Sequence, residues 1–305
     1  MAENTNIEWC DSTFNPWIGC TRVSPACDDC YAARSTPART LGVEWGPHAA
    51  RHRTAPATWK QPEAWERQHE AFFAEHGRRR RVFCASLADV FDNAVPVEWR
   101  LDLFKLIAAT PHLDWLLLTK RIGNVATMLG DYQTVPLLPN IWLGITVVNQ
   151  AEADRDIPKL LAVPARVRFL SVEPMLGPID LNYAFGIPSG AGRGSCPMHL
   201  AGVCPEGLRP IGQQHLHWVI CGGESGPHAR PMHPDWPRGL RDQCAAAGVA
   251  FMFKQWGEWL PGENAMHEIG HEVAHHQDGK WGATSTKVSE KNYVVWTADG
   301  SEHRG

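Results

Sequence analysis

The chain has 305 residues, of which 44% are hydrophobic and 20% are charged, and this composition excludes general disorder. The formal net charge is -4, so there is no global positive field to hold nucleic acid, and any such contact must be local. No apolar run approaches the ~18 residues that cross a bilayer, and the start lacks the order of a signal peptide, so we expect a cytoplasmic protein without membrane contact.

Short aliphatic or β-branched runs recur along the chain, separated by stretches long enough for a helix. Continuous apolar strands that alternate with helices are typical of a parallel sheet covered on both faces. In chain order, we predict strands over Trp17 to Cys20, Arg81 to Leu87, Asp114 to Lys120, Ile141 to Val147, Arg166 to Pro174, His217 to Glu224 and Val249 to Trp256. Helices are predicted over Val97 to Ala109, Gln150 to Ala162 and Pro234 to Ala247. The predicted fold class is α/β, a full or partial β/α (TIM-like) barrel.

Polar side chains follow the predicted strands at their carboxyl ends. In β/α barrels this end carries the active site, because the loops there converge on one mouth. The residues in question are Ser86, Asp89, Thr119, Lys120, Thr146, Asn149, Glu173, Glu224 and Lys254. A single polar residue at a strand end is equally explained by contact with solvent, but the whole set predicts the rim of an active site.

One insertion breaks the alternation of strands and helices. Residues 184–214 are dense in Gly and Pro, which predicts a long loop over the mouth, either a lid or a substrate-contacting insertion. After Trp259 the sequence becomes polar and rich in His, and the run from Lys291 to Gly300 suits a hairpin or an added edge strand. We therefore expect a barrel over residues 1–259 and a carboxyl-terminal extension over residues 260–305.

Three cysteines near the amino terminus form the most informative motif. Within residues 15–32, Cys20, Cys27 and Cys30 follow the spacing C-x6-C-x2-C, with no fourth cysteine nearby. A structural zinc site takes four protein ligands, whereas a [4Fe-4S] cluster held by three thiolates keeps one iron free for another ligand. The motif therefore favours a [4Fe-4S] cluster over a zinc ion or three cysteines that bind no metal.

This loop resembles the cluster loop of radical S-adenosylmethionine (radical SAM) enzymes, in particular the spore photoproduct lyase-like branch. The shared elements are Asn15-Pro16-Trp17, Gly19-Cys20 and Cys30-Tyr31-Ala32. Across nearly the whole chain, the sequence is similar to a phage-associated radical-SAM-like family known as a domain of unknown function. That likeness rests on the cluster loop and on residues 118–121, 171–174, 221–226 and 253–257. The common spacing is C-x3-C-x2-C, so this loop is three residues longer.

The resemblance implies a [4Fe-4S] cluster on the three cysteines, S-adenosylmethionine as cofactor, a 5'-deoxyadenosyl radical, and an electron donor such as flavodoxin or ferredoxin. Four strand-end residues are expected to hold S-adenosylmethionine, namely Ser86, Asp89, Thr119 and Thr146. Four others are expected to surround the reacting carbon as catalytic residues, namely Lys120, Glu173, Glu224 and Lys254.

The same resemblance points to a pyrimidine in DNA or a modified nucleotide as substrate. The leading expectation is isomerisation or modification of an amino-acid-adducted thymidine in phage DNA, which would occur in the host cytoplasm. A lesion-reversing lyase of the photoproduct lyase type is the alternative within the same class. A zinc-stabilised nucleic-acid-binding protein without catalysis is the alternative from another class.

Three other patterns have competing interpretations. His267, His271 and His275 form two overlapping H-E-x-x-H matches, but Gly270 interrupts the helix that such a zinc site needs, so a solvated segment is favoured. Cys196, His199 and Cys204 have zinc-like separations within the insertion, and their role stays open. The basic run from Arg78 to Arg81 suits either phosphate contact or a solvated face.

Overall fold

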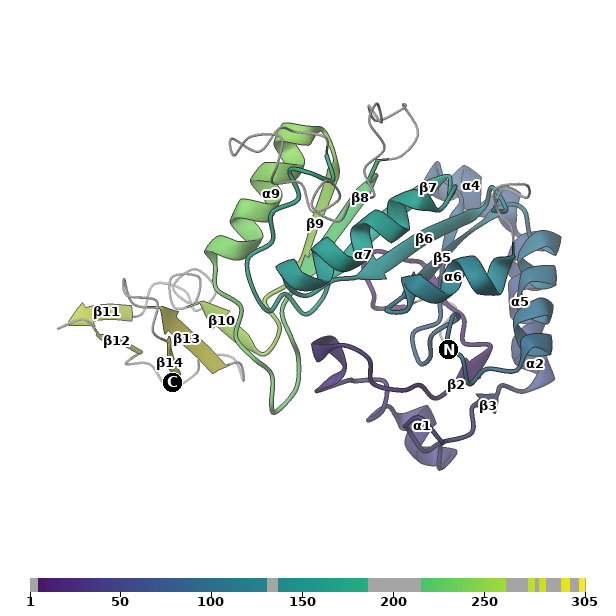
Figure 1. Cartoon of the computed structure of the whole chain (residues 1–305), viewed down its shortest axis with the longest axis horizontal. Helices are drawn as coiled ribbons and strands as arrows, with labels where there is room; N and C mark the ends of the chain where they lie inside the picture. The colour runs from purple at the N-terminus through teal and green to yellow at the C-terminus, as the bar shows by residue number, and fades with distance from the viewer. Residues whose placement is uncertain are drawn as a thin grey trace.

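The computed structural model describes residues 5–130, 137–185 and 215–261, together with the backbone of four short strands between residues 274 and 304. Its main feature is a seven-stranded sheet in the order β1-β4-β5-β6-β7-β8-β9 (Figure 1), in which every neighbouring pair is parallel. The strands are β1 (Ser12–Thr13), β4 (Arg80–Cys84), β5 (Leu113–Thr119), β6 (Ile141–Thr146), β7 (Val167–Val172), β8 (Trp218–Gly222) and β9 (Ala250–Gln255). The sheet curls without closing, so the predicted α/β class is confirmed as a partial TIM-like barrel.

The helices follow the strands as predicted. α5 (Val97–Ala109) and α7 (Gln150–Ala162) have the predicted bounds, and α9 (Asp235–Ala247) begins one residue later than predicted. α7 begins where it does because the Asn149 side chain accepts a hydrogen bond from the Glu152 amide at 3.0 Å. The remaining helical elements are η1 (Pro25–Cys27), α1 (Thr36–Thr40), α2 (Pro56–Trp59), α3 (Gln61–Arg67), α4 (His69–His76) and α6 (Ile122–Leu129). None of the described helices is long and apolar enough to cross a membrane.

The prediction of the first barrel strand was wrong. Trp17–Ile18 forms β2, which pairs antiparallel with β3 (His52–Arg53) in a separate small sheet. The first barrel strand is instead β1, where Ser12 and Thr13 pair with Val82 and Phe83. Both residues of β1 are polar but buried, so no hydrophobic run marks this strand in the sequence.

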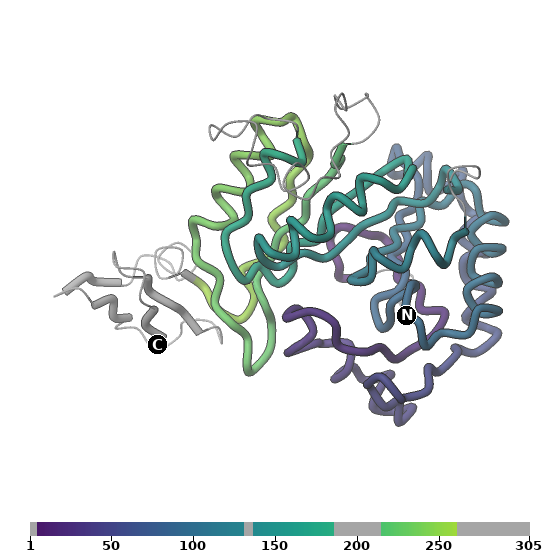
Figure 2. Tube along the Cα trace, viewed as in Figure 1, coloured from purple at the N-terminus to yellow at the C-terminus, as the bar shows by residue number. Residues whose placement is uncertain are grey.

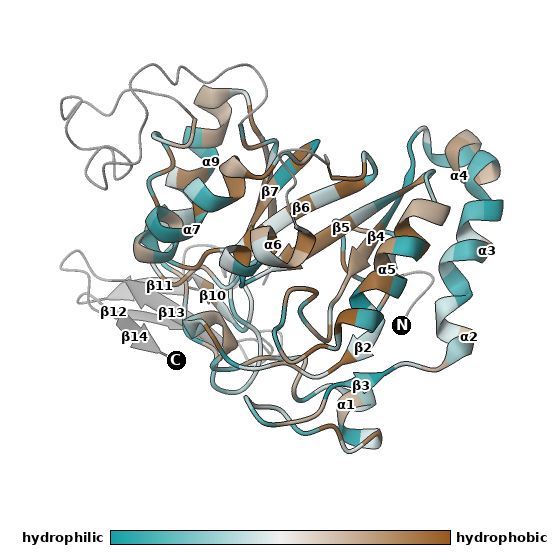
Figure 3. Ribbon diagram, turned by 45° about the vertical axis from the view of Figure 1, so that its right-hand side comes forward, coloured by the Kyte–Doolittle hydropathy of each residue, from teal (hydrophilic) through white to brown (hydrophobic). Residues whose placement is uncertain are grey.

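The two faces of the sheet pack differently. The outer face lies against the helices and forms the larger core, and Figure 3 shows the strands mostly in hydrophobic colours. The inner face packs a smaller cluster of Trp9, Cys10, Phe83, Leu116, Phe169 and Ile220. Gly144 on β6 faces this cluster, and a Cβ atom there would lie 2.3 Å from the Phe169 ring. Glycine at this position therefore lets the Phe169 ring fill the inside of the half-barrel.

The carboxyl-terminal strands form sheets of their own. β10 (Trp259–Pro261) pairs parallel with β13 (Asn292–Trp296), which pairs antiparallel with β14 (Glu302–Arg304). The run from Lys291 to Gly300 thus contributes to a hairpin and not to an edge of the main sheet. β11 (Ala274–Gln277) and β12 (Lys280–Ala283) form another antiparallel pair, so His275 lies in a strand and not in the helix that H-E-x-x-H requires. The boundary at residue 259 stays a prediction.

Several predicted features lie outside the described residues. These are most of the insertion, with Cys196, His199 and Cys204, and the pair His267 and His271.

Hydrogen bonds of Asp11 hold the amino-terminal segment against β4. Its carboxylate accepts hydrogen bonds from Arg78 at 2.6 and 2.8 Å and from the Arg81 amide at 2.7 Å. Burial alone would raise the pKa of Asp11, but these bonds outweigh it and hold the pKa below its usual range.

We expect Asp11→Asn to lower the free energy of unfolding at pH 7 by about 1.5–3 kcal/mol, because hydrogen bonds to a charged group are lost. The native carboxylate contributes stability above the unfolded pKa of roughly 3.9, and this contribution disappears as pH falls through the lower folded pKa. Denaturant unfolding at pH 7 and pH 3 measures both effects. A difference between the two proteins that does not shrink in acid would contradict this account.

Candidate active site

The predicted site residues line one cavity of about 380 Å³ at the carboxyl ends of the strands. In Figure 2 the purple and blue amino-terminal segment, which contains the three cysteines, runs past these strand ends. The eleven residues predicted as cluster, cofactor or catalytic residues lie on the wall, namely Cys20, Cys27, Cys30, Ser86, Asp89, Thr119, Lys120, Thr146, Glu173, Glu224 and Lys254. Asn149, predicted for the same rim, does not line the cavity and caps α7 instead. The volume lies in the range of small-molecule and cofactor sites.

The segment that carries the three cysteines, residues 15–32, is called the cysteine loop below and is built largely from short turns. Ser24 caps the 3-10 helix η1, because its Oγ accepts a hydrogen bond from the Ala26 amide at 3.1 Å. Cys20, Cys27 and Cys30 are all free thiols of intermediate exposure. Burial raises the pKa of Cys20 to about 11, while the neighbouring Arg121 guanidinium acts in the opposite direction.

The three cysteine sulfurs do not meet the spacing of a single-ion site in this arrangement. Among the described residues, only Glu66, His69 and His112 bring three ligand atoms within 4.8 Å of one another, so at least one pair of the cysteine sulfurs is further apart than this. A tetrahedral zinc ion with Zn–S bonds of about 2.3 Å holds its sulfurs roughly 3.8 Å apart. A cluster is larger than one ion, so it is bound by thiolates that are further apart.

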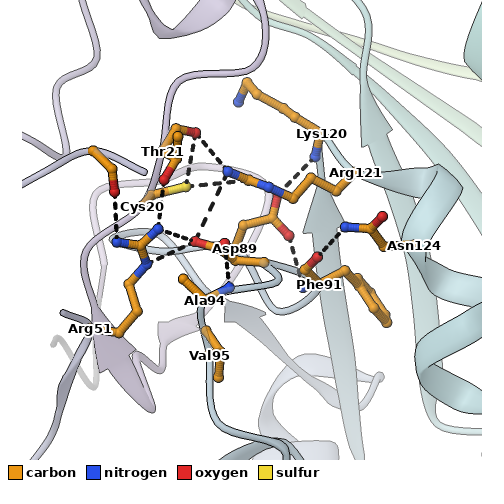
Figure 4. A network of polar contacts seen from close by, with 12 residues as sticks. Cys20, Thr21, Arg51, Asp89, Phe91, Ala94, Val95, Lys120, Arg121 and Asn124 are labelled. Carbon is orange, nitrogen blue, oxygen red and sulfur yellow. Dashed lines mark hydrogen bonds and ion pairs between the residues drawn. The ribbon is translucent and has the colours of Figure 1, made fainter. Parts of the chain in front are cut away.

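Asp89 and Arg121 form a buried pair beneath the cysteine loop (Figure 4). The Asp89 carboxylate accepts hydrogen bonds from Thr119 Oγ1 at 2.8 Å, the Lys120 amide at 3.0 Å and Arg121 Nη1 at 2.9 Å. It also accepts one from the Phe91 amide at 2.9 Å. Asp89 is therefore fully engaged by the protein, and its clearest role is to orient Arg121.

Arg121 connects this pair to the cysteine loop. Its Nη1 donates to Cys20 Sγ at 3.3 Å and its Nη2 donates to the Thr21 carbonyl at 2.6 Å. The side chain is 8% exposed, so these bonds are shielded from water. Arg51, which is fully buried, holds the other side of the same loop by donating to Thr21 Oγ1 at 2.6 Å and to Asp92 at 2.8 Å.

Arg230 anchors the far side of the cysteine loop. Its guanidinium donates two hydrogen bonds to the Glu224 carboxylate, from Nε at 2.8 Å and from Nη2 at 2.6 Å. The same guanidinium donates to the Pro25 carbonyl at 2.9 Å and to Asp28 at 3.1 Å. Glu224 thus serves the site by holding Arg230 in place.

The beginning of the loop is anchored to the end of β4. Asn15 Nδ2 donates to Ser86 Oγ at 2.9 Å, and Asn15 Oδ1 accepts from the Leu87 amide at 2.7 Å. The Tyr31 hydroxyl donates to the Ser86 carbonyl at 3.0 Å. The loop is therefore tied down near both of its ends.

The rest of the cavity wall carries both paired and unpaired polar groups among the described residues. Lys254 Nζ pairs with Glu173 Oε1 at 2.9 Å, and Ser171 Oγ donates to the other Glu173 oxygen at 3.2 Å. Thr146 is buried, and within the described part of the chain its hydroxyl has no hydrogen-bond partner. The Lys120 ammonium makes no ion pair with a described residue and carries no contact in Figure 4. Thr146 and Lys120 are therefore available to bind a ligand.

Several residues of this site were not predicted from the sequence, among them Arg51, Arg121, Asn15 and Arg230. Arg121 directly follows Lys120 at the end of β5, so its position was a usable signal. Asn15 belongs to the cysteine motif but was not assigned a role. Arg230 lies in an irregular stretch beyond β8, where no periodicity or motif marks it.

The fold and the cavity define a partial β/α-barrel protein with a three-cysteine candidate active site. The chain belongs to the family described as "Protein of unknown function (DUF5131)", whose family model matches residues 4–299. No curated protein matches the sequence.

Two solved structures of spore photoproduct lyase show a distant likeness. One is a double mutant with bound AdoMet and dinucleoside spore photoproduct, at 12% identity and a TM-score of 0.38, with 77% of this chain and 61% of that chain covered. The other is a single mutant at 11% identity and a TM-score of 0.45, with 83% and 79% covered. The chain thus spans less than two thirds of the first of these proteins.

Proposed function

We propose that this protein is a radical S-adenosylmethionine enzyme that acts on nucleic acid. The observation that carries the proposal is the cavity itself, where three free cysteines and eight polar strand-end residues line one wall. One-electron cleavage of S-adenosylmethionine is the chemistry that a three-cysteine [4Fe-4S] cluster supplies when bound.

In this proposal, different residues bind the cluster, bind the cofactor or substrate, and face the reacting carbon. Cys20, Cys27 and Cys30 would hold the cluster. Thr146 and Lys120 offer an unpartnered hydroxyl and an unpaired ammonium to the cofactor or the substrate. The ion pair of Lys254 and Glu173 would face the reacting carbon.

Asp89, predicted to hold the cofactor, and Glu224, predicted to be catalytic, take a different role in this proposal. The carboxylates of Asp89 and Glu224 are each occupied by an arginine, so we assign them to positioning. Ser86 and Thr119 also bond to protein groups, and they would shape the wall of the cofactor site. Trp9 and Phe83 line the same cavity and would keep water from it.

For the substrate, we propose an amino-acid-adducted thymidine in phage DNA, isomerised or otherwise modified at a C–H bond. This choice rests on the sequence likeness to the phage-associated family and to the photoproduct lyase branch. A base in duplex DNA must leave the stack to enter a cavity of this size. Reversal of a DNA lesion is the second candidate, and a flavodoxin or ferredoxin would donate the electron in either case.

Anaerobic reconstitution followed by iron and sulfide analysis tests the proposal, together with dithionite reduction in the presence of S-adenosylmethionine. We expect about four irons per chain, the number in a [4Fe-4S] cluster, and formation of 5'-deoxyadenosine. Tightly bound zinc without cofactor cleavage would reject the enzyme and favour a zinc-stabilised nucleic-acid-binding protein. Turnover of thymidine-adducted against photoproduct-containing DNA then separates the two substrates.

Arg121→Met should make the reduction potential of the cluster more negative, because a hydrogen bond to a ligating sulfur stabilises the reduced state. A redox titration followed by electron paramagnetic resonance measures this potential. Arg230→Gln is the matched control, since Arg230 holds the same loop without touching a sulfur. Equal potentials in the two variants at full iron content would show that Arg121 only supports the loop.

A further inference from the structure

A second group of ligand-type side chains lies away from the cavity. Glu66 is in α3, His69 begins α4, and His112 directly precedes the first residue of β5. Because the cavity is at the carboxyl ends of the strands, this group lies at the opposite, amino-terminal edge of the sheet. The proposed radical chemistry uses none of these residues.

The three side chains converge within a short distance. One ligand atom from each lies within 4.8 Å of the other two, which no other trio of His, Cys, Asp or Glu achieves in the described part of the chain. His112 Nδ1 is 2.5 Å from Glu66 Oε1, and the His112 amide donates to Glu66 Oε2 at 3.1 Å. The two imidazole rings are stacked, with centroids 3.8 Å apart and an angle of 12° between their planes, so one ring must turn before both can bind the same ion.

A hydrogen bond to the backbone fixes which ring nitrogen of His69 carries the proton. His69 Nδ1 lies 2.8 Å from the Glu66 carbonyl oxygen, which can only accept, so Nδ1 carries the proton. This leaves the lone pair of Nε2 for a ligand. Metal-binding histidines commonly donate their other ring N–H to a backbone carbonyl in this way, because the bond fixes the tautomer.

Exposure permits a metal ion to enter. The His112 side chain is 46% exposed and that of Glu66 is 17% exposed. His112 can therefore turn its ring toward an ion shared with Glu66 and His69. The ion would replace the hydrogen bond between Glu66 and His112 by bonds to both.

We infer that Glu66, His69 and His112 form a binding site for a late first-row divalent ion such as Zn²⁺, Co²⁺ or Ni²⁺. Two imidazoles and one carboxylate suit these ions better than Mg²⁺ or Ca²⁺, which prefer oxygen ligands. With three protein ligands, water completes the coordination. A bound ion would link the junction between α3 and α4 to the residue that precedes β5. The role of the site is therefore to stabilise the fold when the metal is bound.

Titration of the full chain with Co²⁺ tests the site, since its visible spectrum separates nitrogen and oxygen ligands from thiolates. We expect d–d bands that persist in Cys27→Ala, together with a rise in melting temperature. His69→Ala and His112→Ala should each weaken Co²⁺ binding by at least ~10-fold. His76→Ala is the matched control, because His76 lies in the same helix α4 outside the group and should leave binding unchanged.

Circular dichroism of each variant without metal verifies that it is folded, and Glu66→Gln provides an independent removal of a ligand. Equal Co²⁺ affinity in wild type, His69→Ala and His112→Ala would overturn the inference. A spectrum with only thiolate-to-cobalt bands would do the same. Neither outcome bears on the cluster, so the inference and the proposed function fail separately.

Discussion

Replacing Cys27 by alanine is expected to abolish S-adenosylmethionine cleavage while leaving most of the fold intact. The cluster would lose one of its three protein ligands, whereas the half-exposed Cys27 side chain contributes little to the core. Iron content after anaerobic reconstitution should fall well below that of the wild type, and 5'-deoxyadenosine should be undetectable. Thermal unfolding of the unreconstituted proteins should differ by only a few degrees.

Cys244→Ala is the control for this experiment. Cys244 is buried in α9 and does not line the cavity, so its loss should cost some packing energy but neither iron nor cleavage. Full cleavage by Cys27→Ala would contradict the proposed function. Loss of stability together with loss of tightly bound zinc would instead indicate a structural metal site.

Gly223→Ala should destabilise the protein by more than about 4 kcal/mol, an exceptionally large effect for a single substitution. A Cβ atom at residue 223 would lie 1.8 Å from the Trp256 carbonyl oxygen, and backbone cannot turn away as a side chain can. Gly257 faces the same constraint, since a Cβ atom there would lie 2.1 Å from the Glu224 carbonyl and its φ is +86°. Denaturant unfolding measures the loss.

Gly239→Ala provides the opposite expectation within the same chain. Gly239 lies in α9, and a Cβ atom added there would have no neighbour within 4 Å, so alanine should stabilise the helix by about 0.5–1 kcal/mol. A Gly223→Ala protein as stable as the wild type would show that the ends of β8 and β9 can separate. In that case the hydrogen bond from the Gly223 amide to the Gln255 carbonyl at 2.9 Å would not position Glu224 and Lys254.

The barrel architecture was predictable because its strands and helices carry strong periodic signals. β5 and β6 contain the apolar runs of residues 115–118 and 141–145, and α7 has a capping Asn149 followed by an amphipathic pattern. The first strand was missed because Ser12 and Thr13 are buried through backbone pairing with β4, which leaves no hydrophobic trace.

The set of cavity residues was predictable for a geometric reason. Parallel strands place their carboxyl ends at one edge, so polar residues that follow different strands must meet there. Which of these residues form hydrogen bonds within the protein was not predictable, because their partners are distant in sequence. Arg230 reaches Asp28 across 202 positions, and Arg121 reaches Cys20 across 101. The sequence therefore pointed to Asp89 as a cofactor ligand and to Glu224 as a catalytic residue, whereas both carboxylates accept hydrogen bonds from arginines in the structure.

The open edges of the half-barrel have a consequence for self-association. A closed barrel has no free edge, whereas β1 and β9 are the outermost described strands of this sheet. Edge strands can pair with another copy and aggregate, and proteins limit this with very short strands or inward-pointing charges. β1 has two residues, and β9 carries Lys254 pointing inward to Glu173. The same lysine that belongs to the candidate active site is thus also the kind of inward-pointing charge that disfavours pairing of this edge with a second chain.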